Sequence, residues 1–197
     1  MIGKLVPFRQ TTGQPESLSD DALVAACGAQ DSAALGALFD RYADDVHAFV
    51  YRIRGIDDGF VDDIVQETFL HAFESASRFR GGSSVRTWLL AIAANTAKTH
   101  IRGEIRRRER GVAYVELHPK DSQRPDQAAQ DHELLQKVQA ALDALPHDQR
   151  VAFTLCDIEE VRGIDAAKSL GIRQGTLYKR LHDARRAIRT FILGERP

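Results

Sequence analysis

The segment IDAAKSLGIRQGTLYKRLHDARRAI, residues 164–188, holds side chains that are typical of sequence reading on double-stranded DNA. Gly171 allows a sharp turn between a short helix and a longer one, because glycine adopts a positive φ without steric cost. In a helix-turn-helix the first turns of the second helix meet base edges in the major groove. The residues expected there and along the same helix are Arg173, Gln174, Thr176, Tyr178, Lys179, Arg180, His182, Asp183, Arg185 and Arg186. This pattern favours DNA reading over an ordinary helical hairpin, which stays open as an alternative.

A second candidate segment, RGGSSVRTWLLAIAANTAKTHIR at residues 80–102, carries the only tryptophan of the chain. Apolar positions recur at the helical period and predict one face packed on a core, namely Val85, Leu89, Ile92 and Thr96. Asn95, Lys98 and Arg102 form a polar and basic stripe beside this face. Trp88 lies on the border, where a tryptophan is usually half core and half surface.

The net charge of −1 hides a strong asymmetry along the chain. Acidic residues outnumber basic ones in residues 16–74, whereas basic residues dominate residues 75–114 and 162–189. Two basic blocks on amphipathic helices, far apart in sequence, favour nucleic acid as a ligand over merely solvated helix faces. The acidic block indicates contact with a basic protein instead.

Composition argues against several other classes of protein. No apolar run approaches the roughly 18 residues of a membrane span, and the N-terminus does not resemble a signal peptide. Cys27 and Cys156 are isolated, and the seven histidines are scattered without metal-ligand spacing. No nucleophile or phosphate-loop motif appears. We therefore expect a soluble, cytoplasmic protein without membrane insertion, metal, cofactor or enzymatic activity.

The hydrophobic periodicity predicts an all-α fold, since no run alternates apolar and polar residues as a half-buried strand does. In the first half we expect a helix after Ser19 and Asp20, then helices over about 32–54, 61–79 and 84–110. In the second half, Pro146 is expected as the first residue of a helix. The predicted spans there are about 132–145, 146–158, 164–170 and 174–193.

Residues 111–131 combine two prolines with polar side chains and little periodicity, which predicts a flexible linker. This linker divides the chain into an N-terminal tail at 1–18, a helical domain at 19–110 and a helix-turn-helix domain at 132–197. The two domains are expected to move independently in the free protein.

The order and spacing of four segments resemble a sigma factor of the sigma-70 family, in its minimal extracytoplasmic-function (ECF) group. DDIVQETFLHAF at 62–73 is similar to region 2.2, and residues 79–102 are similar to regions 2.3 and 2.4. LDALPHDQRVAFTL at 142–155 resembles region 4.1, and the helix-turn-helix resembles region 4.2. The resemblance covers about residues 22–190. It implies a transcription initiation factor that binds RNA polymerase core, directs it to promoters and helps to open the −10 element.

The resemblance further implies that the tryptophan helix and the loop before it hold the non-template strand of the −10 element. Single-stranded DNA needs apolar or aromatic surfaces for its bases and cations for its phosphates. An extruded base also needs an amide or hydroxyl at its Watson–Crick edge. The implied −10 residues are Arg80, Ser83, Ser84, Arg86, Trp88, Asn95, Lys98 and Arg102. For Trp88, a packing role stays equally open.

Further partners besides this DNA strand follow from the resemblance. The helix at 61–79 is implied to dock on the β′ clamp helices of polymerase, with Leu70 as an apolar anchor. Its expected contacts are Asp62, Asp63, Gln66, Glu67, Leu70 and Glu74. The helix-turn-helix is implied to read the −35 element and to contact the β flap. An anti-sigma factor is the expected regulator in trans.

The recognition segment departs from the common ECF pattern GTVKSRLxRAR, since residues 175–185 read GTLYKRLHDAR. Tyr178 and Asp183 replace cations, and an aspartate can accept from cytosine N4, so we expect an uncommon −35 sequence. Residues 164–166 also depart from the pattern and predict looser helix-turn-helix packing. Two other classes stay open: a helix-turn-helix regulator that binds duplex DNA without polymerase, and an anti-sigma protein.

Overall fold

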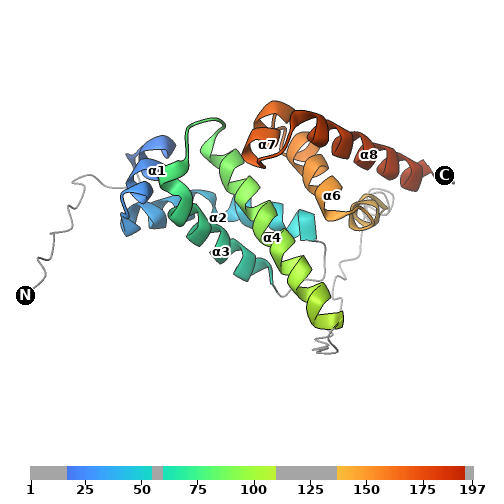
Figure 1. Ribbon diagram of the computed structural model, residues 1–197, viewed down its shortest axis with the longest axis horizontal. Helices are drawn as coiled ribbons and strands as arrows, with labels where there is room; N and C mark the ends of the chain where they lie inside the picture. Colours follow the sequence, from blue (N-terminus) through green and yellow to red (C-terminus); the bar gives the residue numbers. More distant parts are fainter. Residues whose placement is uncertain (1–16, 55–59, 110–136, 194–197) are drawn as a thin grey trace, which may run out of the picture.

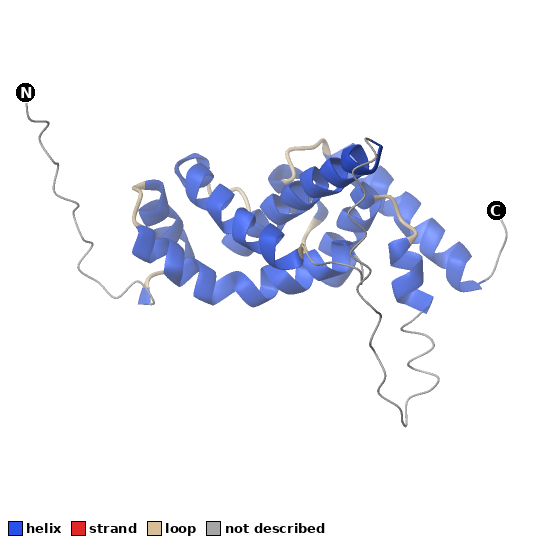
Figure 2. Cartoon of the chain, turned by 90° about the horizontal axis from the view of Figure 1, so that it is seen from below, coloured by secondary structure: helices blue, strands red, loops and turns tan. Residues whose placement is uncertain are grey.

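The computed structural model describes residues 17–54, 60–109 and 137–193 (Figure 1). Every regular element in these residues is a helix, and the helices form two domains (Figures 1 and 2). The prediction of an all-α protein with two helical domains is therefore confirmed. Most of the predicted tail and all of the predicted linker lie outside the described residues. No helix in the described part is both long and apolar enough to span a bilayer.

The N-terminal domain contains four helices: α1 (Asp20–Gly28), α2 (Ser32–Arg54), α3 (Val61–Ser75) and α4 (Val85–Glu109). The Ser19 hydroxyl caps α1 by accepting from the Ala22 N–H at 3.3 Å, as its residue type predicts. The expected continuation of α3 to residue 79 is wrong. The α-helix ends at Ser75 and tightens into a 3₁₀ turn at Ala76–Arg78, a common ending for an α-helix.

The core of this domain lies between α2, α3 and α4. Its fully buried side chains include Leu38, Phe49, Ile53, Ile64 and Leu89. Phe39 is 39% exposed, although its ring packs on that of Phe69 with 4.9 Å between the ring centroids. The aromatic contact keeps Phe39 at the edge of the core.

The C-terminal domain begins in the described residues with a helical segment at 137–143. It continues with α6 (His147–Phe153), a π-helical turn (Thr154–Ile158), α7 (Gly163–Ser169) and α8 (Gln174–Leu193). Pro146 is the N-cap of α6 and not its first helical residue, since its ψ of 141° is still extended. Gly171 adopts a φ of +66° between α7 and α8, as the sequence predicts.

Of the segment for which looser packing is expected, Ile164 is 55% exposed, whereas the alanines that follow it are buried. Ala166, Ala167 and Leu177 are 0–3% exposed at the contact between α7 and α8. Tyr178 lies against Gly163, where an added Cβ would come within 2.9 Å of the tyrosine Oη. The large ring therefore fills the space above this glycine.

The two domains pack against each other, and the expectation of independent movement is not what the structure shows. Buried apolar side chains of both domains belong to one continuous cluster, which includes Ala94 of α4 together with Val151 and Leu155. Helix α7 contacts α4 and lies beside its first turns (Figure 1). Contacts between residues so distant in the chain produce no local sequence pattern, so periodicity cannot predict them.

Candidate nucleic-acid interface

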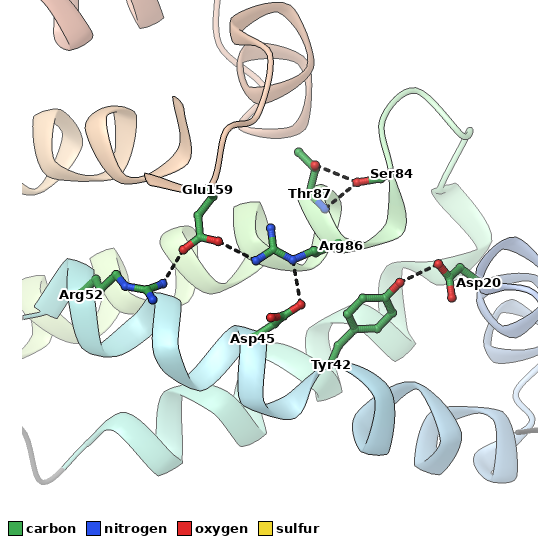
Figure 3. Close-up of polar contacts among 8 residues, drawn as sticks. All are labelled: Asp20, Tyr42, Asp45, Arg52, Ser84, Arg86, Thr87 and Glu159. Carbon is green, nitrogen blue, oxygen red and sulfur yellow. Dashed lines mark hydrogen bonds and ion pairs between the residues drawn. The ribbon is translucent and has the colours of Figure 1, made fainter. Parts of the chain in front are cut away.

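The loop before α4 supplies the helix with its cap. The Ser84 hydroxyl accepts from the Thr87 N–H at 3.1 Å and lies 2.8 Å from the Thr87 hydroxyl (Figure 3). Gly81 has a φ of +64°, a conformation that glycine adopts at no steric cost. Ser84 therefore has a clear structural role in starting the helix that carries the polar stripe.

Trp88 packs against residues of its own domain, the N-terminal one. Its ring lies 4.9 Å from that of Phe79, at an interplanar angle of 42°. It is partly buried against the main apolar cluster, whereas Val85, Leu89 and Thr96 of the same helix are buried. This arrangement supports the packing role that the sequence left open.

The polar stripe of α4 faces the C-terminal domain. Lys98 Nζ donates to both carboxylate oxygens of Asp148, at 2.7 and 2.9 Å. Arg180 of α8 approaches the same carboxylate at 2.7 Å. Burial alone would raise the pKa of Asp148, but the Lys98 hydrogen bond and the charge of Arg180 hold it below its ordinary value. One carboxylate thus joins a predicted −10 residue to a predicted −35 residue.

Arg86, another predicted −10 residue, is held by two carboxylates (Figure 3). Its Nε donates to Asp45 at 2.7 Å, and its NH2 group donates to Glu159 of the C-terminal domain. Glu159 also accepts from Arg52 of α2, and only 7% of the Glu159 side chain is exposed. The hydrogen bond to Asp45, followed by that to Glu159, raises the pKa of Arg86 and secures its charge.

The loop itself is covered by α7. The Ser169 hydroxyl donates to the Ser83 hydroxyl at 2.8 Å, and the Lys168 side chain lies over Gly82. A cavity of about 70 Å³ remains further along the contact; its lining includes Asn95, Lys98, His147, Asp148 and Arg180. Arg80, Asn95 and Arg102 keep exposed surface. The structure therefore brings the predicted −10 residues to one side of the domain, where several are engaged by the other domain.

The predicted polymerase face of α3 is open. Asp62, Asp63, Gln66, Leu70 and Glu74 are exposed, with Leu70 at 56%. Glu67 is half-buried, and its carboxylate lies 2.9 Å from Nε2 of His100 on α4. The face thus combines one projecting apolar side chain with surrounding acidic and amide groups.

The recognition helix α8 is also largely open. Eight of the ten predicted −35 residues are exposed; Arg180 and Asp183 are half-buried. Asp183 accepts from Lys179 at 2.9 Å, and this hydrogen bond lowers its pKa. Arg185 donates to Asp157 at 2.8 Å within the same domain. Tyr178 is 49% exposed, although one side of its ring lies on Gly163.

The sequence analysis missed the residues that join the domains. Asp148 and Glu159 contact partners 32 to 107 positions away, and no local pattern signals such pairs. Arg150 is buried and donates to the carbonyls of Ile53, Asp143 and Leu145, so it caps helix ends in both domains. His147 donates through Nε2 to the Ala94 carbonyl at 3.1 Å, and burial lowers its pKa to about 4.

Together these features define a two-domain, all-α DNA-binding protein with a helix-turn-helix in its second domain. Residues 38–107 match the family described as Sigma-70 region 2, and residues 135–188 match Sigma-70, region 4. The chain is 33% identical over 181 residues to the ECF RNA polymerase sigma-E factor of Haemophilus influenzae. The aligned part covers 88% of this chain and 95% of that relative.

Two further proteins extend the comparison. The ECF RNA polymerase sigma factor SigE of Mycolicibacterium smegmatis is 32% identical over 157 residues, and this chain spans 60% of its length. The sigma factor RpoE of Bartonella quintana, solved in complex with the anti-sigma factor NepR, superposes with a TM-score of 0.59 at 25% identity. That match covers 80% of this chain and 96% of RpoE. The chain therefore belongs to the ECF sigma factors of the sigma-70 family, the transcription initiation factors that direct RNA polymerase to promoters.

Proposed function

We propose that this sigma factor divides its tasks between three helices. The exposed face of α3 binds polymerase core, α8 reads the −35 duplex, and α4 with its preceding loop holds the non-template −10 strand. The functional domains span 19–110 and 132–197, with 111–131 as the connection. The observation that carries the proposal is that both sigma-70 regions match and cover these three helices in a chain of sigma-E length.

The polymerase contact is proposed to centre on Leu70. An exposed apolar side chain on a helix face supplies desolvation energy when a partner helix covers it. The acidic and amide groups around it steer the encounter with a basic surface on the β′ clamp helices. The C-terminal domain is proposed to contact the β flap as well.

The two DNA surfaces are proposed to differ in chemistry. Arg173, Gln174 and Thr176 project from the first turn of α8 and are exposed, as major-groove reading requires. Asn95 supplies an amide for a base edge on α4, and Lys98 and Arg102 supply cations for the single-stranded backbone. An anti-sigma protein that covers the exposed faces of α3 and α4 is proposed as the regulator in trans, by likeness to RpoE, which NepR binds.

Run-off transcription tests the proposal directly. Core polymerase plus this protein should give discrete transcripts from a library of genomic fragments, and core polymerase alone should not. A protein that binds duplex fragments equally well without polymerase, and gives no transcripts, is instead a helix-turn-helix regulator.

The polymerase face can be tested within the same assay. Reversing Asp63 and Glu67 to Lys should weaken core binding at least tenfold, the scale expected when like charges meet across an interface. Circular dichroism should show unchanged helicity, because both side chains keep exposed surface on α3. The double variant Asp21→Lys and Asp40→Lys, at exposed positions of α1 and α2, is the matched control for charge. Unchanged affinity of the reversed variant for core polymerase would remove α3 from the interface.

A further inference from the structure

The first turn of the recognition helix α8 carries an amide side chain whose orientation is set by a neighbour one turn further on. Nε2 of Gln174, the first residue of α8, donates to Oη of Tyr178 at 3.5 Å. Both residues are exposed, and residues four positions apart lie on one face of a helix. The contact directs the carboxamide nitrogen of Gln174 towards the tyrosine and leaves its carbonyl oxygen on the other side.

The ring of Tyr178 is placed in turn by the first residue of α7. An added Cβ on Gly163 would come within 2.9 Å of the tyrosine Oη and 3.0 Å of two ring carbons, so a glycine is needed for the ring to lie where it does. The ring still leaves 49% of Tyr178 exposed. Gly163, Tyr178 and Gln174 therefore form a chain of contacts that begins on α7 and ends at an exposed amide on α8.

A glutamine amide matches the edge of one base in the major groove. It offers a donor and an acceptor side by side. Adenine presents the complementary pair, an N7 acceptor next to an N6 donor, whereas guanine presents two acceptors and cytosine a donor. Oε1 of Gln174 can accept from adenine N6 while Nε2 donates to N7. Nε2 carries two hydrogens, so one can stay on the Tyr178 hydroxyl while the other reaches the base.

We propose that Gln174 reads an adenine of the −35 element and that Tyr178 is its positioning residue, held from α7 through Gly163. This inference rests on the proposed function of α8 and adds to it the identity of one base. Tyr178 restricts the amide to the orientation that adenine requires, so less side-chain freedom is lost on binding. The same orientation opposes guanine, because Oε1 would then face the O6 acceptor.

The test uses the full-length chain bound to core polymerase and a pool of duplex DNA with a randomised central window. Sequencing of the bound fraction gives the base preference at each position of the enriched site. With the unmodified chain, one position should prefer adenine by about tenfold, the scale of a contact through two hydrogen bonds. Gln174→Glu should change the preference at that position alone from adenine to cytosine, because a carboxylate accepts from cytosine N4. The other positions of the site are the internal control.

Two further variants test the positioning role. Tyr178→Phe keeps the ring over Gly163 but removes the hydroxyl, and the preference for adenine should fall about threefold at the same position only, the scale of one neutral hydrogen bond. Gly163→Ala should give the same selective loss from α7, since the added methyl displaces the tyrosine Oη. Gly36→Ala on α2 is the matched control, because nothing lies within 4 Å of the added Cβ. It should leave every preference unaltered, and circular dichroism should show unchanged helicity in all four variants.

Two results would overturn the inference. One is an enriched site whose base preferences are the same for Gln174→Glu and the unmodified chain. The other is a folded Tyr178→Phe variant that keeps its full preference for adenine or loses affinity equally for every sequence. Failure of the proposed function gives a different result, since the chain with polymerase would then enrich no duplex sequence over polymerase alone.

Discussion

The two helices assigned to DNA, α4 and α8, differ in what their cations contact. On α4, Arg86 and Lys98 pair with carboxylates of the other domain. On α8, Lys179 pairs with Asp183 and Arg185 with Asp157, all within one domain. Arg180 alone among the assigned residues of α8 reaches the contact between domains through Asp148. The cations assigned to the −10 strand are thus partly covered by the other domain, while most of those assigned to the −35 element are open.

Burial makes this difference energetic as well as geometric. The Lys179 side chain is 77% exposed, and exposed ion pairs contribute little because water and salt screen them. A phosphate can therefore replace Asp183 as the partner of Lys179 with little loss. The Glu159 carboxylate is almost fully buried between two arginines, and removing one partner of a buried pair is costly. The comparison teaches that Lys179 on α8 can change its partner at little cost, whereas Arg86 on α4 must first leave a buried carboxylate.

The largest effect is expected at Arg150, a buried residue whose side chain donates to carbonyls of both domains. Arg150→Met keeps an apolar stem but leaves the carbonyls of Ile53, Asp143 and Leu145 without this donor. The free energy of unfolding should fall by about 3 kcal/mol, since buried acceptors then lose a charged partner. Urea denaturation measures it.

The matched control for this substitution is Arg189→Met on the exposed side of α8. It should change the free energy of unfolding by less than about 0.5 kcal/mol, as exposed substitutions usually do. If both substitutions lower the free energy of unfolding equally, the hydrogen bonds of Arg150 between the domains do not stabilise the fold.

Protonation of His147 at low pH should destabilise the contact between the two domains. Burial lowers its pKa from 6.5 to about 4, so the open state binds more protons between these values. The closed arrangement is therefore stabilised as pH rises through this window and loses stability as pH falls, by about 2 kcal/mol at pH 5. The charges of Lys98 and Arg150 also lower the pKa of His147, whereas the neighbouring Asp148 carboxylate raises it.

Scattering measured at pH 7 and pH 5 checks this expectation. The radius of gyration should increase at pH 5 in the unmodified chain. It should change less in His147→Gln, which cannot take up the proton, whereas His182→Gln on exposed α8 should behave like the unmodified chain. A radius independent of pH in the unmodified chain would contradict the assignment to His147.

The contrast between α4 and α8 also shows which features of the structure could be predicted from the sequence. Long amphipathic periods predicted α2 and α8 with their observed bounds, and Gly171 predicted the turn before α8. The exposure of the residues predicted on α8 was accessible too, because they lie on consecutive turns of one local helix. The end of α3 was missed, since the change to a 3₁₀ turn at Ala76–Arg78 leaves the apolar period intact.

The covered state of α4 was inaccessible to sequence reasoning for a physical reason. Arg86 and Glu159 are 73 positions apart, and an ion pair at that separation follows from the packing of two domains. Trp88 could be placed only at a border, because helical spacing does not reveal that Phe79 packs on its ring. Charges on an exposed stripe predict a ligand of opposite charge, but not whether that ligand is DNA or the chain's own carboxylate.

A substitution at Asn95 tests whether α4 and α8 have separate roles in DNA binding. Asn95→Ala removes an amide from α4 but leaves Lys98 and the apolar face in place. It should cost about 1–3 kcal/mol of discrimination at one −10 base, the scale of a good side-chain contact to a base. Binding to −35 duplex should stay unchanged, because α8 lies in the other domain. Transcription from pre-melted templates with single-base changes measures the loss.

An Asn95→Ala variant that impairs −35 binding as much as −10 recognition would break the division of labour between the two helices. Thr99→Ala, one turn further along α4, is a suitable control, since its hydroxyl already donates to the Asn95 carbonyl at 3.1 Å. It should leave discrimination at every −10 base unaltered.

The smallest effect is expected on the open side, at Lys179. Lys179→Ala should weaken −35 duplex binding by less than about 1 kcal/mol, because the exposed cation gives up only its pair with Asp183 to reach a phosphate. If the contact is to phosphate alone, the weakening should be nearly the same for every duplex sequence, and the slope of log K against log salt should flatten by about one unit. The Arg185→Ala variant, which also frees Asp157, should show the same flattening with a somewhat larger loss. Titrations of duplex at several salt concentrations measure both quantities. A Lys179→Ala loss confined to one base pair would instead assign this lysine to base reading, and the open side of the molecule would then be as selective at this position as the covered one.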